Sequence, residues 1–314
     1  MRIVAGVEAF RRRGAGSVHI AMGTFDGLHR GHRAVVDTLL AAAQVDGESV
    51  ITTFDPHPMA VLAPPSQPFL LTTVAERLDL FAAAGADTAL VLRYDEQTRD
   101  VPASEWLDVL TRRIEARHVV VSSTHTFGRD REGDASFLQS WGREHGVRVT
   151  IVPLVRDGNR IISSSGVREL LRGGDVGTAA SWLGRWYSVS GPVVRGEGRG
   201  RAIGVPTANL RLPPEKLVPA TGVYAAYATL QGVTHRAAVN VGVRPTFGGG
   251  GGLSVEAHLL DTELDVYGER LELAFVERLR AEIRFSGAAE LLTQIGVDVE
   301  RARAILATGP VQMS

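Results

Sequence analysis

Residues 23–32 read Gly23-Thr24-Phe25-Asp26-Gly27-Leu28-His29-Arg30-Gly31-His32, and this stretch decides the fold of the first half of the chain. It follows a short run rich in Val and Ile (18–22) that predicts a strand, and it leads into a helix-like run at 31–43. A turn between a strand and a helix points backbone N–H groups and the positive end of the helix at any anion bound there. The stretch therefore predicts an anion-binding turn in an α/β domain.

Strand-like and helix-like runs alternate through the rest of the first half. Further strands are predicted at 50–54, 88–93, 118–121 and 147–154. Further helices are predicted at 74–84, 104–116 and 134–145. The helix at 74–84 has the clearest start, because Thr73 and Glu76 form a capping box and Gly85 ends the helix. This alternation predicts a doubly wound parallel sheet.

The pattern changes after about residue 185, where strand-like runs follow one another without helices between them. These runs lie at 223–230, 237–241, 255–260 and 271–276, and a final helix is predicted at 288–306. Glycines cluster here, and the five-glycine run at 248–252 predicts a loop. We therefore predict an antiparallel barrel with a C-terminal helix, and domains at 1–185 and 186–314.

Composition excludes several classes of protein. The chain has 314 residues, 44% hydrophobic and 22% charged, with a formal net charge of -1, which gives no reason to expect a nucleic-acid partner. It has no cysteine, so disulfides, thiolate nucleophiles and Cys-based zinc sites are excluded. The apolar run after Arg11, Arg12 and Arg13 is broken by His19 and Asp26, so we expect a cytoplasmic protein without a membrane partner. The oligomeric state stays open, a homo-oligomer included.

His29 and His32 are the candidate catalytic residues of the first domain. They stand three apart with Gly31 between them, so both imidazoles can face one phosphate while the backbone approaches it closely. A metal pair, with His57 as a third ligand, and a pair of surface residues are the alternatives. The strand–turn–helix context favours the phosphate.

Two further segments favour a nucleotide site. FDPHP at 54–58 follows the second strand, at the edge of the sheet where open α/β folds bind ligands. ISSSGVRE at 162–169 places hydroxyls, followed by Arg168, at the start of a helix. A rigid proline turn and a plain serine cap are the alternative interpretations.

In the second half, a glycine-rich loop at 196–204 leads directly into Val205-Pro206-Thr207-Ala208-Asn209. It is not a Walker A loop, because no Gly-Lys-Ser/Thr follows and no helix begins there. The loop alone indicates no more than a β-turn, and a strand carboxylate such as Glu256 is more often solvated than catalytic.

These motifs together resemble the bacterial bifunctional riboflavin kinase/FAD synthetase family over almost the whole chain. They are GTFDGLHRGH at 23–32, TFDPHP at 53–58, LTTVAERL at 71–78, SSSGVRELL at 163–171 and PTAN at 206–209. The first half is similar to the wider HxGH nucleotidyltransferases, so the resemblance implies a Rossmann-like nucleotidyltransferase domain followed by a riboflavin kinase barrel.

The resemblance implies that the first domain transfers AMP from ATP to FMN with release of pyrophosphate. The catalytic residues would be His29, His32 and Arg168. The nucleotide-binding residues would be Gly23, Thr24, Phe25, Asp26, Gly31, Ser164 and Ser165. The flavin-binding residues would be Asp55, His57, Pro58, Thr124 and Phe127.

One segment departs from the family. Residues 122–128 read SSTHTFG where the family has Gly-x-Asp/Asn-Phe-x-Phe-Gly, so Thr124 replaces the acidic or amide residue and His125 replaces the aromatic one. A threonine hydroxyl is shorter and lacks the two-pronged carboxylate or amide. Losing one matched hydrogen bond at a buried site costs about 1–3 kcal/mol. We therefore expect phosphate binding to persist and the flavin or nucleotide preference to be the open question.

For the second domain the resemblance implies a riboflavin kinase that uses ATP and Mg²⁺. Glu256 would be the base for the ribityl 5′-hydroxyl, and Thr207 and Asn209 would hold the metal. Gly196, Gly198, Gly200 and Gly204 would wrap the ATP phosphates, and Arg280 would belong to the segment that covers the flavin. Two alternatives stay open: a working kinase whose first domain uses another flavin or nucleotide or is regulatory, and a non-catalytic flavin-binding regulator.

Overall fold

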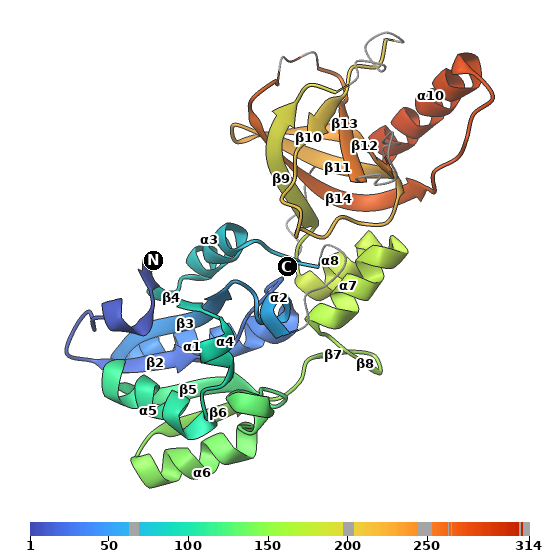
Figure 1. Cartoon of the computed structure of the whole chain (residues 1–314). Coiled ribbons are helices and arrows are strands. Elements are labelled where there is room, and N and C mark those ends of the chain that lie inside the picture. Colours follow the sequence, from blue (N-terminus) through green and yellow to red (C-terminus); the bar gives the residue numbers. More distant parts are fainter. Residues whose placement is uncertain are drawn as a thin grey trace. The chain divides into compact units, whose positions relative to one another are not determined.

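The computed structural model of the chain describes residues 1–62, 69–196, 204–243, 253–262, 264, 266–307 and 309. They form two compact units, Met1–Ser164 and Ser165–Ser314 (Figure 1). Gly198, Gly200, the segment 244–247 and the glycine run 248–252 lie outside the described residues.

A parallel sheet forms the centre of the first unit, in the order β1-β4-β3-β2-β5-β6. Its strands are β1 (Arg2–Ala5), β2 (Ser17–Ala21), β3 (Gly47–Asp55), β4 (Thr88–Arg93), β5 (Ala116–Ser122) and β6 (Arg148–Val152). Its longer helices are α1 (Arg30–Asp46), α3 (Val74–Ala84), α5 (Ala103–Arg113) and α6 (Ala135–His145). Shorter elements are η1 (Val7–Ala9), α2 (Pro58–Leu62), α4 (Glu96–Arg99), η2 (Arg129–Arg131) and the hairpin of β7 (Arg156–Asp157) and β8 (Arg160–Ile161).

Helices cover both faces of this sheet. On one face Leu107 of α5 and Trp141 of α6 pack into a core with Val119 of β5, and on the other Leu39 of α1 and Phe81 of α3 pack into a second core. The capping box predicted for α3 is present, with Gly85 in the left-handed conformation after the helix. The predicted doubly wound α/β fold is confirmed.

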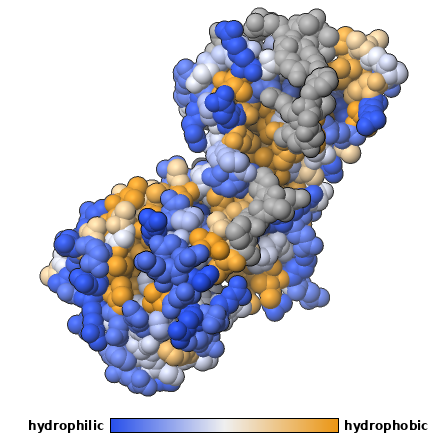
Figure 2. Space-filling view, in the orientation of Figure 1, coloured by the Kyte–Doolittle hydropathy of each residue, from blue (hydrophilic) through white to orange (hydrophobic). Residues whose placement is uncertain are grey.

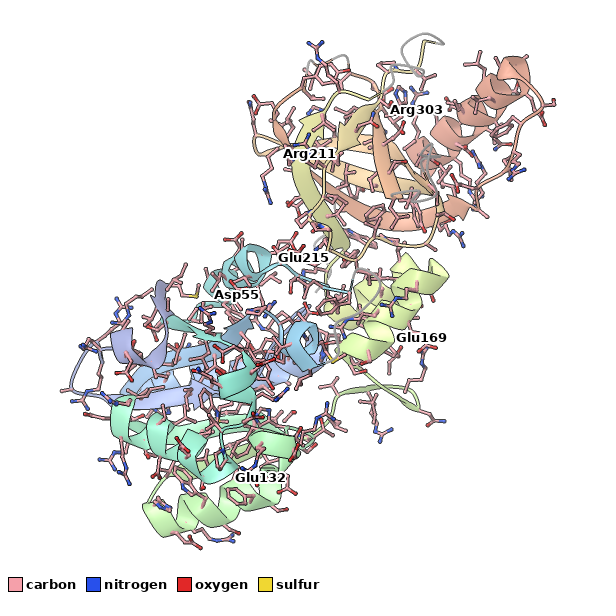
Figure 3. All side chains as sticks on the ribbon, in the orientation of Figure 1. Asp55, Glu132, Glu169, Arg211, Glu215 and Arg303 are labelled. Atoms are coloured by element: carbon pink, nitrogen blue, oxygen red, sulfur yellow. The ribbon has the colours of Figure 1, made fainter. Side chains whose placement is uncertain are left out.

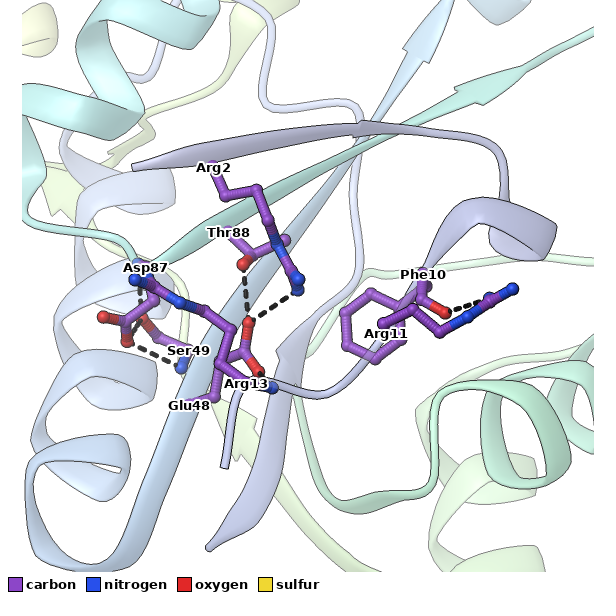
Figure 4. Close-up of polar contacts among 8 residues, drawn as sticks. All are labelled: Arg2, Phe10, Arg11, Arg13, Glu48, Ser49, Asp87 and Thr88. Atoms are coloured by element: carbon purple, nitrogen blue, oxygen red, sulfur yellow. Dashed lines mark hydrogen bonds and ion pairs between the residues drawn. The ribbon is translucent and has the colours of Figure 1, made fainter. Parts of the chain in front are cut away.

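The edge strand β1 is joined to the sheet by polar contacts to the buried carboxylate of Glu48 (Figure 4). Glu48 accepts hydrogen bonds from Arg2 at 3.0 Å, from the Thr88 hydroxyl at 2.6 Å and from the backbone N–H of Arg13 at 2.9 Å. These contacts join the N-terminal segment to β3 and β4 because a single carboxylate accepts from all three. β1 was not predicted, since it is four residues long and only Val4 in it is buried.

Two buried histidines join neighbouring strands near their amino ends, at the opposite edge of the sheet from the turn at 23–32. The Nδ1 atoms of His19 and His118 lie 3.1 Å apart, His19 also contacts Asp46, and His118 also contacts Thr150 and Arg148. Burial, and then the Arg148 and His19 charges, lower the pKa of His118 to about 4.

The second unit contains a closed barrel in the order β10-β13-β12-β11-β14-β9, antiparallel at every pairing. Its strands are β9 (Tyr187–Val194), β10 (Ala208–Leu210), β11 (Gly222–Leu230), β12 (Val233–Val243), β13 (Leu253–Leu259) and β14 (Arg270–Arg280). The C-terminal helix α10 (Ala288–Ile305) packs on the outside through Ala302 and Val299, and Arg303 binds Asp261 at 2.6 Å (Figure 3). The predicted barrel with a C-terminal helix is confirmed.

Two helices lie between the sheet and the barrel in sequence, and they belong to the second compact unit. They are α7 (Ser164–Gly173) and α8 (Val176–Leu183). Leu171 accepts a hydrogen bond from the backbone of Ala220, and Gly174 leaves space for Arg278 of β14. The compact units therefore divide at Ser164/Ser165, earlier than the predicted boundary at 185/186, because α7 and α8 pack with the barrel strands.

The visible surfaces of both units mix hydrophilic and hydrophobic residues (Figure 2). Among the described residues, no helix has both the length and the apolar character that crossing a membrane requires.

Candidate functional sites

The turn at 23–32 brings His29 and His32 together as the sequence predicts. His29 is the N-cap of α1, and its Nδ1 accepts a hydrogen bond from the backbone N–H of His32 at 3.2 Å. The two rings stack with their centroids 3.7 Å apart and their planes 17° apart. Both imidazoles therefore lie side by side at the N-terminus of α1, where the helix dipole favours an anion.

The contact at Nδ1 fixes how His29 can act. A neutral imidazole has one N–H and one acceptor nitrogen, and Nδ1 of His29 is the acceptor. The proton of neutral His29 must therefore lie on Nε2, which makes that atom a hydrogen-bond donor. A donor fixed at a helix N-terminus is suited to a phosphate oxygen that gains negative charge.

Glycines in the turn leave room for its packing. A Cβ at residue 31 would lie 3.1 Å from Cε1 and Nδ1 of His29, and a Cβ at residue 27, where φ is +84°, would lie 2.7 Å from Leu71. Phe25 lies in the core, 2% exposed, with its ring edge-on to His32 at 5.2 Å. Phe25 therefore packs against the His32 ring.

Asp26 is buried and joins the turn to the segment before α3. Its carboxylate accepts hydrogen bonds from the backbone N–H of Leu71 and from both the backbone N–H and the hydroxyl of Thr72. The Thr72 hydroxyl in turn accepts from the backbone N–H of Gly27 at 3.0 Å. The predicted nucleotide-binding residue Asp26 thus directs its side chain into the protein, where it sets the shape of the turn.

Arg77 of α3 is a fully buried guanidinium that sequence reasoning did not single out. It donates to the Thr24 carbonyl at 3.0 Å, to the Thr53 hydroxyl at 2.6 Å and to the Thr72 carbonyl at 3.3 Å. The turn, the end of β3 and the segment before α3 are thereby fixed to one another.

Ser164 is brought to the turn, because its hydroxyl donates to the carbonyl of Asp26 at 2.9 Å. Ser165 and Arg168 lie on α7 in the second compact unit, and their assignment to the nucleotide stays a prediction.

A cavity of about 290 Å³ lies at the carboxyl edge of the sheet. Its wall is formed by Met22, Gly23, Thr24, Thr52, Phe54, His57, Pro58, Met59, Leu62, Tyr94, Thr98, Arg99, Val101, Trp106, His125, Thr126, Phe127, Gly128 and Arg131. Predicted nucleotide residues (Gly23, Thr24) and predicted flavin residues (His57, Pro58, Phe127) therefore meet in one hollow. Asp55 is exposed at the end of β3 and is not part of this wall (Figure 3).

The wall is rich in aromatic rings from separate segments. Phe54 lies edge-on to Tyr94 at 5.6 Å and tilted against Trp106 at 6.5 Å. Burial raises the pKa of Tyr94, against the charges of Arg99 and Arg131. Flat apolar walls with a few polar groups are suited to a planar ring system. Tyr94 and Trp106 were missed, although Tyr94 directly follows a predicted strand.

The segment that departs from the family forms part of this wall through His125 and not through Thr124. Thr124 is exposed in a turn closed by the His125 N–H on the Ser122 carbonyl. The His125 ring stacks on Phe127 with centroids 5.6 Å apart, and its Nε2 is buried. The residue as a whole is half-buried, and its burial lowers the pKa of His125 to about 4.

In the barrel, strand register brings the predicted kinase residues together. Asn209 of β10 pairs with Glu256 of β13, and Glu256 pairs on its other side with Asn240 of β12. Residues that pair directly across neighbouring strands point to the same face of a sheet. Asn209, Glu256 and Asn240 therefore form one polar row. Asn240 was not assigned a role, although the sequence places it in the family-like segment at 240–247.

The segments that flank β10 pack against this row and its neighbours. A Cβ at Gly196 would lie 2.5 Å from Nδ2 of Asn209, so the start of the glycine-rich loop packs against that amide. His258 contacts the carbonyl of Pro206 at 2.8 Å, which ties the segment before Thr207 to β13. Gly204 has a φ of +80°, a conformation that favours glycine.

Arg280 forms an ion pair with Asp298 of α10. It pairs with Val223, which pairs with Asn240, so it lies on the same face as the polar row. Its guanidinium forms three hydrogen bonds with the buried Asp298 of α10, the shortest at 2.7 Å. Arg280 therefore fixes α10 to the barrel beside the row, and its contact with flavin stays a prediction.

The alternative of a metal site at His29 and His32 would need a third ligating side chain nearby. Across the described ranges, no group of three or more His, Asp or Glu side chains could hold a metal ion. His57 instead accepts the backbone N–H of Met59 through Nδ1.

Both halves match known families. Residues 13–166 match the FAD synthetase family and residues 183–306 match the riboflavin kinase family. The chain is 36% identical over 310 residues to the bifunctional riboflavin kinase/FMN adenylyltransferase of Pseudomonas fluorescens, covering 98% of each protein. The chain belongs to the bifunctional riboflavin kinase/FMN adenylyltransferase family.

Other members of this family agree. The Escherichia coli K12 protein is 34% identical, covering 96% of this chain and 97% of its own length, and the Bacillus subtilis protein is 32% identical, covering 90% of each. Among solved structures, one described as a macrolide-efflux protein from Streptococcus pneumoniae superimposes with a TM-score of 0.87 at 30% identity, covering 96% of this chain and 99% of that one. The shared fold thus extends over nearly the whole chain.

Proposed function

We propose that this protein phosphorylates riboflavin to FMN with ATP and then adenylylates FMN to FAD with release of pyrophosphate. One observation carries the proposal: each matched segment contains one of the two sites described above. The histidine turn and the aromatic cavity lie within 13–166, which matches the FAD synthetase family, and the polar barrel row lies within 183–306, which matches the riboflavin kinase family. We propose a functional boundary at 185/186, so that α7 and α8 belong to the adenylyltransferase half although they pack with the barrel.

In the adenylyltransferase half, a phosphate oxygen of FMN attacks the α-phosphorus of ATP. A new P–O–P bond forms, the bond between the α-phosphorus and the bridging oxygen breaks, and pyrophosphate leaves. No protein nucleophile is required, so the site contributes position and charge stabilisation. The Nε2 proton of His29 and the neighbouring His32 stabilise charge on the α-phosphoryl oxygens, and the N-terminus of α1 adds its dipole.

The aromatic cavity holds the isoalloxazine ring of the flavin. It begins at Gly23 and Thr24, next to the histidine turn, and continues to Phe54, Trp106 and Phe127. A ring seated there leaves the ribityl phosphate free to extend toward the turn. The FMN phosphate can then attack, in line, the α-phosphorus of an ATP molecule bound at the histidines.

In the kinase half, Glu256 accepts the proton of the riboflavin 5′-hydroxyl as its oxygen attacks the γ-phosphorus of ATP. The bond between the γ-phosphorus and the bridging oxygen breaks, and ADP leaves. Positioned carboxylates perform this role in other kinases. The register supports it, because Glu256 lies between two amides, Asn209 and Asn240, that can orient the carboxylate and the substrate.

Mg²⁺ fits the oxygen donors at the start of β10. The Thr207 hydroxyl and the Asn209 amide carbonyl are hard ligands, and Mg²⁺ in kinases takes few protein ligands beside the substrate phosphates. When bound, the ion neutralises charge on the ATP phosphates. Thr207 and Asn209 would hold the ion there, and the Gly196 backbone packs against the Asn209 amide.

The proposal is tested by supplying FMN and Mg²⁺ with ATP, CTP or GTP in separate reactions and resolving the products by chromatography. FAD formed from ATP alone is the expected result. A dinucleotide formed preferentially from CTP or GTP would favour the alternative in which the first domain uses another nucleotide. Because both reactions consume ATP, we place them in the cytoplasm.

A further inference from the structure

We propose that His125 is a specificity-determining residue of the adenylyltransferase half, whose Nε2 hydrogen-bonds the polar edge of the flavin ring in the aromatic cavity. The inference rests on the proposed function, because it takes flavin as the occupant of the cavity.

The geometry that carries it is a buried polar atom in the wall of a hollow. His125 lines the cavity, its Nε2 is shielded from solvent, and no hydrogen-bonding partner for that atom exists among the described residues. Nearly all buried polar side-chain atoms in proteins have a partner, so an exception requires an explanation. A ligand in the cavity supplies one.

Two other polar groups in the wall, Thr52 and Arg99, have partners within the protein. The Thr52 hydroxyl accepts from the Gly23 N–H at 3.1 Å, and Arg99 forms an ion pair with Asp100 at 2.9 Å. His125 thus brings to the cavity wall a buried nitrogen that has no hydrogen bond among the described residues.

The chemistry of the flavin ring fits this arrangement. One edge of isoalloxazine carries carbonyls, an N–H and ring nitrogens, and the opposite edge carries methyl groups. The pKa of His125 is near 4, so its ring is neutral at neutral pH and offers either a donor or an acceptor to the polar edge. The apolar Met22, Phe54 and Trp106 suit the rest of the ring.

This assignment also accounts for the departure at 122–128. Thr124, which replaces an acidic or amide residue of the family, is exposed and lies outside the cavity wall. His125 keeps a flat ring where the family has an aromatic residue and adds a polar atom. The hydrogen bond lost at Thr124 is thus regained one position later.

The test measures initial rates of FAD formation over a range of FMN concentrations with saturating ATP, in the wild type and His125→Phe. Phenylalanine keeps the stacking on Phe127 and removes the polar atom. We expect kcat/KM for FMN to fall about 5- to 150-fold, mainly through KM, as for the loss of one matched hydrogen bond. His145→Phe, on the exposed end of α6, is the control.

A second measurement is made on the wild-type protein, and a variant serves only to assign the signal. In the full-length protein with ¹⁵N-labelled histidine, FMN should shift the Nε2 resonance of His125, assigned by its loss in His125→Asn. An unmoved resonance, or a kcat/KM within twofold of wild type in a folded His125→Phe protein, would overturn the assignment. Failure of the wild type to form FAD at all would instead sink the proposed function, so the two failures are distinguishable.

Discussion

The two sites of this protein are built by different means. In the first unit the proposed catalytic side chains lie on a turn, and the buried Asp26 and Arg77 hold that turn in shape through hydrogen bonds to distant segments. In the second unit Asn209, Glu256 and Asn240 lie on neighbouring strands, and the strand register aligns them. The first site therefore depends on side-chain hydrogen bonds beneath it, whereas the second depends on the barrel backbone.

The difference has a practical consequence. A substitution beneath the turn should weaken both the stability of the first unit and FAD formation. A substitution within the barrel row should change kinase chemistry and leave the backbone register in place. The predictions below use this contrast.

The largest effect is expected from Glu256→Gln. The amide keeps the size and position of the carboxylate but accepts no proton, so riboflavin phosphorylation should fall about 10²- to 10⁴-fold. FAD formation from added FMN should stay at the wild-type rate. The control is Glu272→Gln, an exposed carboxylate on β14. Kinase activity in the Glu256→Gln protein equal to that of the control would remove Glu256 from the mechanism.

His29→Asn is expected to be next. Asparagine is a good N-cap and can accept the His32 N–H, so α1 should keep its start. The variant lacks the Nε2 donor, and FAD formation should fall about 10²- to 10³-fold, as for removal of one donor to developing charge. Kinase activity should be unchanged, and His145→Asn on α6 serves as the matched histidine control. Rapid FAD formation by the variant would contradict the role of His29.

Asp26→Asn tests the network beneath the turn. In the wild type both carboxylate oxygens accept hydrogen bonds from backbone N–H groups. The amide NH₂ of asparagine is a donor and would face one of these N–H donors, so we expect the first unit to lose about 1–3 kcal/mol of stability. Its melting temperature should fall by roughly 2–4 °C for each kcal/mol. The control is Asp37→Asn, whose pair with Arg33 is exposed on α1. Equal melting temperatures for the two variants would show that the turn does not depend on Asp26.

The smallest effect is the pH dependence of the first unit. The pKa of His118 is lowered from 6.5 to about 4, so between these values the unfolded state binds more protons than the folded state. Stability should therefore decrease as the pH falls from 6.5 toward 4. Melting curves at pH 7 and pH 5 measure this decrease, which should be smaller in His118→Gln. An equal decrease in that variant would place the effect elsewhere.

Local signals in the sequence predicted much of the fold. The capping box at Thr73 and Glu76 marked α3 because it is a local pattern of a few residues. The edge strand β1 was missed because it is short and mostly unburied, and β9 (Tyr187–Val194) because Pro192 and its polar residues interrupt the alternation. Elements whose stability comes from tertiary pairing leave weak local signals.

The sites followed the same rule. The stacked pair of His29 and His32 could be predicted, because their spacing and the adjoining glycine lie within one turn. The cavity wall formed by Tyr94, Trp106 and His125 could not, since only the fold brings those segments together. Likewise, the pairing of Asn240 with Glu256 depends on the strand register, which the sequence does not reveal.

The central claim is that each half of the chain, 1–185 and 186–314, carries one activity, and mixing two variants tests it most directly. Glu256→Gln alone and His29→Asn alone are each given riboflavin, ATP and Mg²⁺, and then the two are combined. We predict that neither alone forms appreciable FAD, that His29→Asn accumulates FMN, and that the mixture forms FAD. FAD from either variant alone at the wild-type rate, or a mixture that forms none, would contradict the claim.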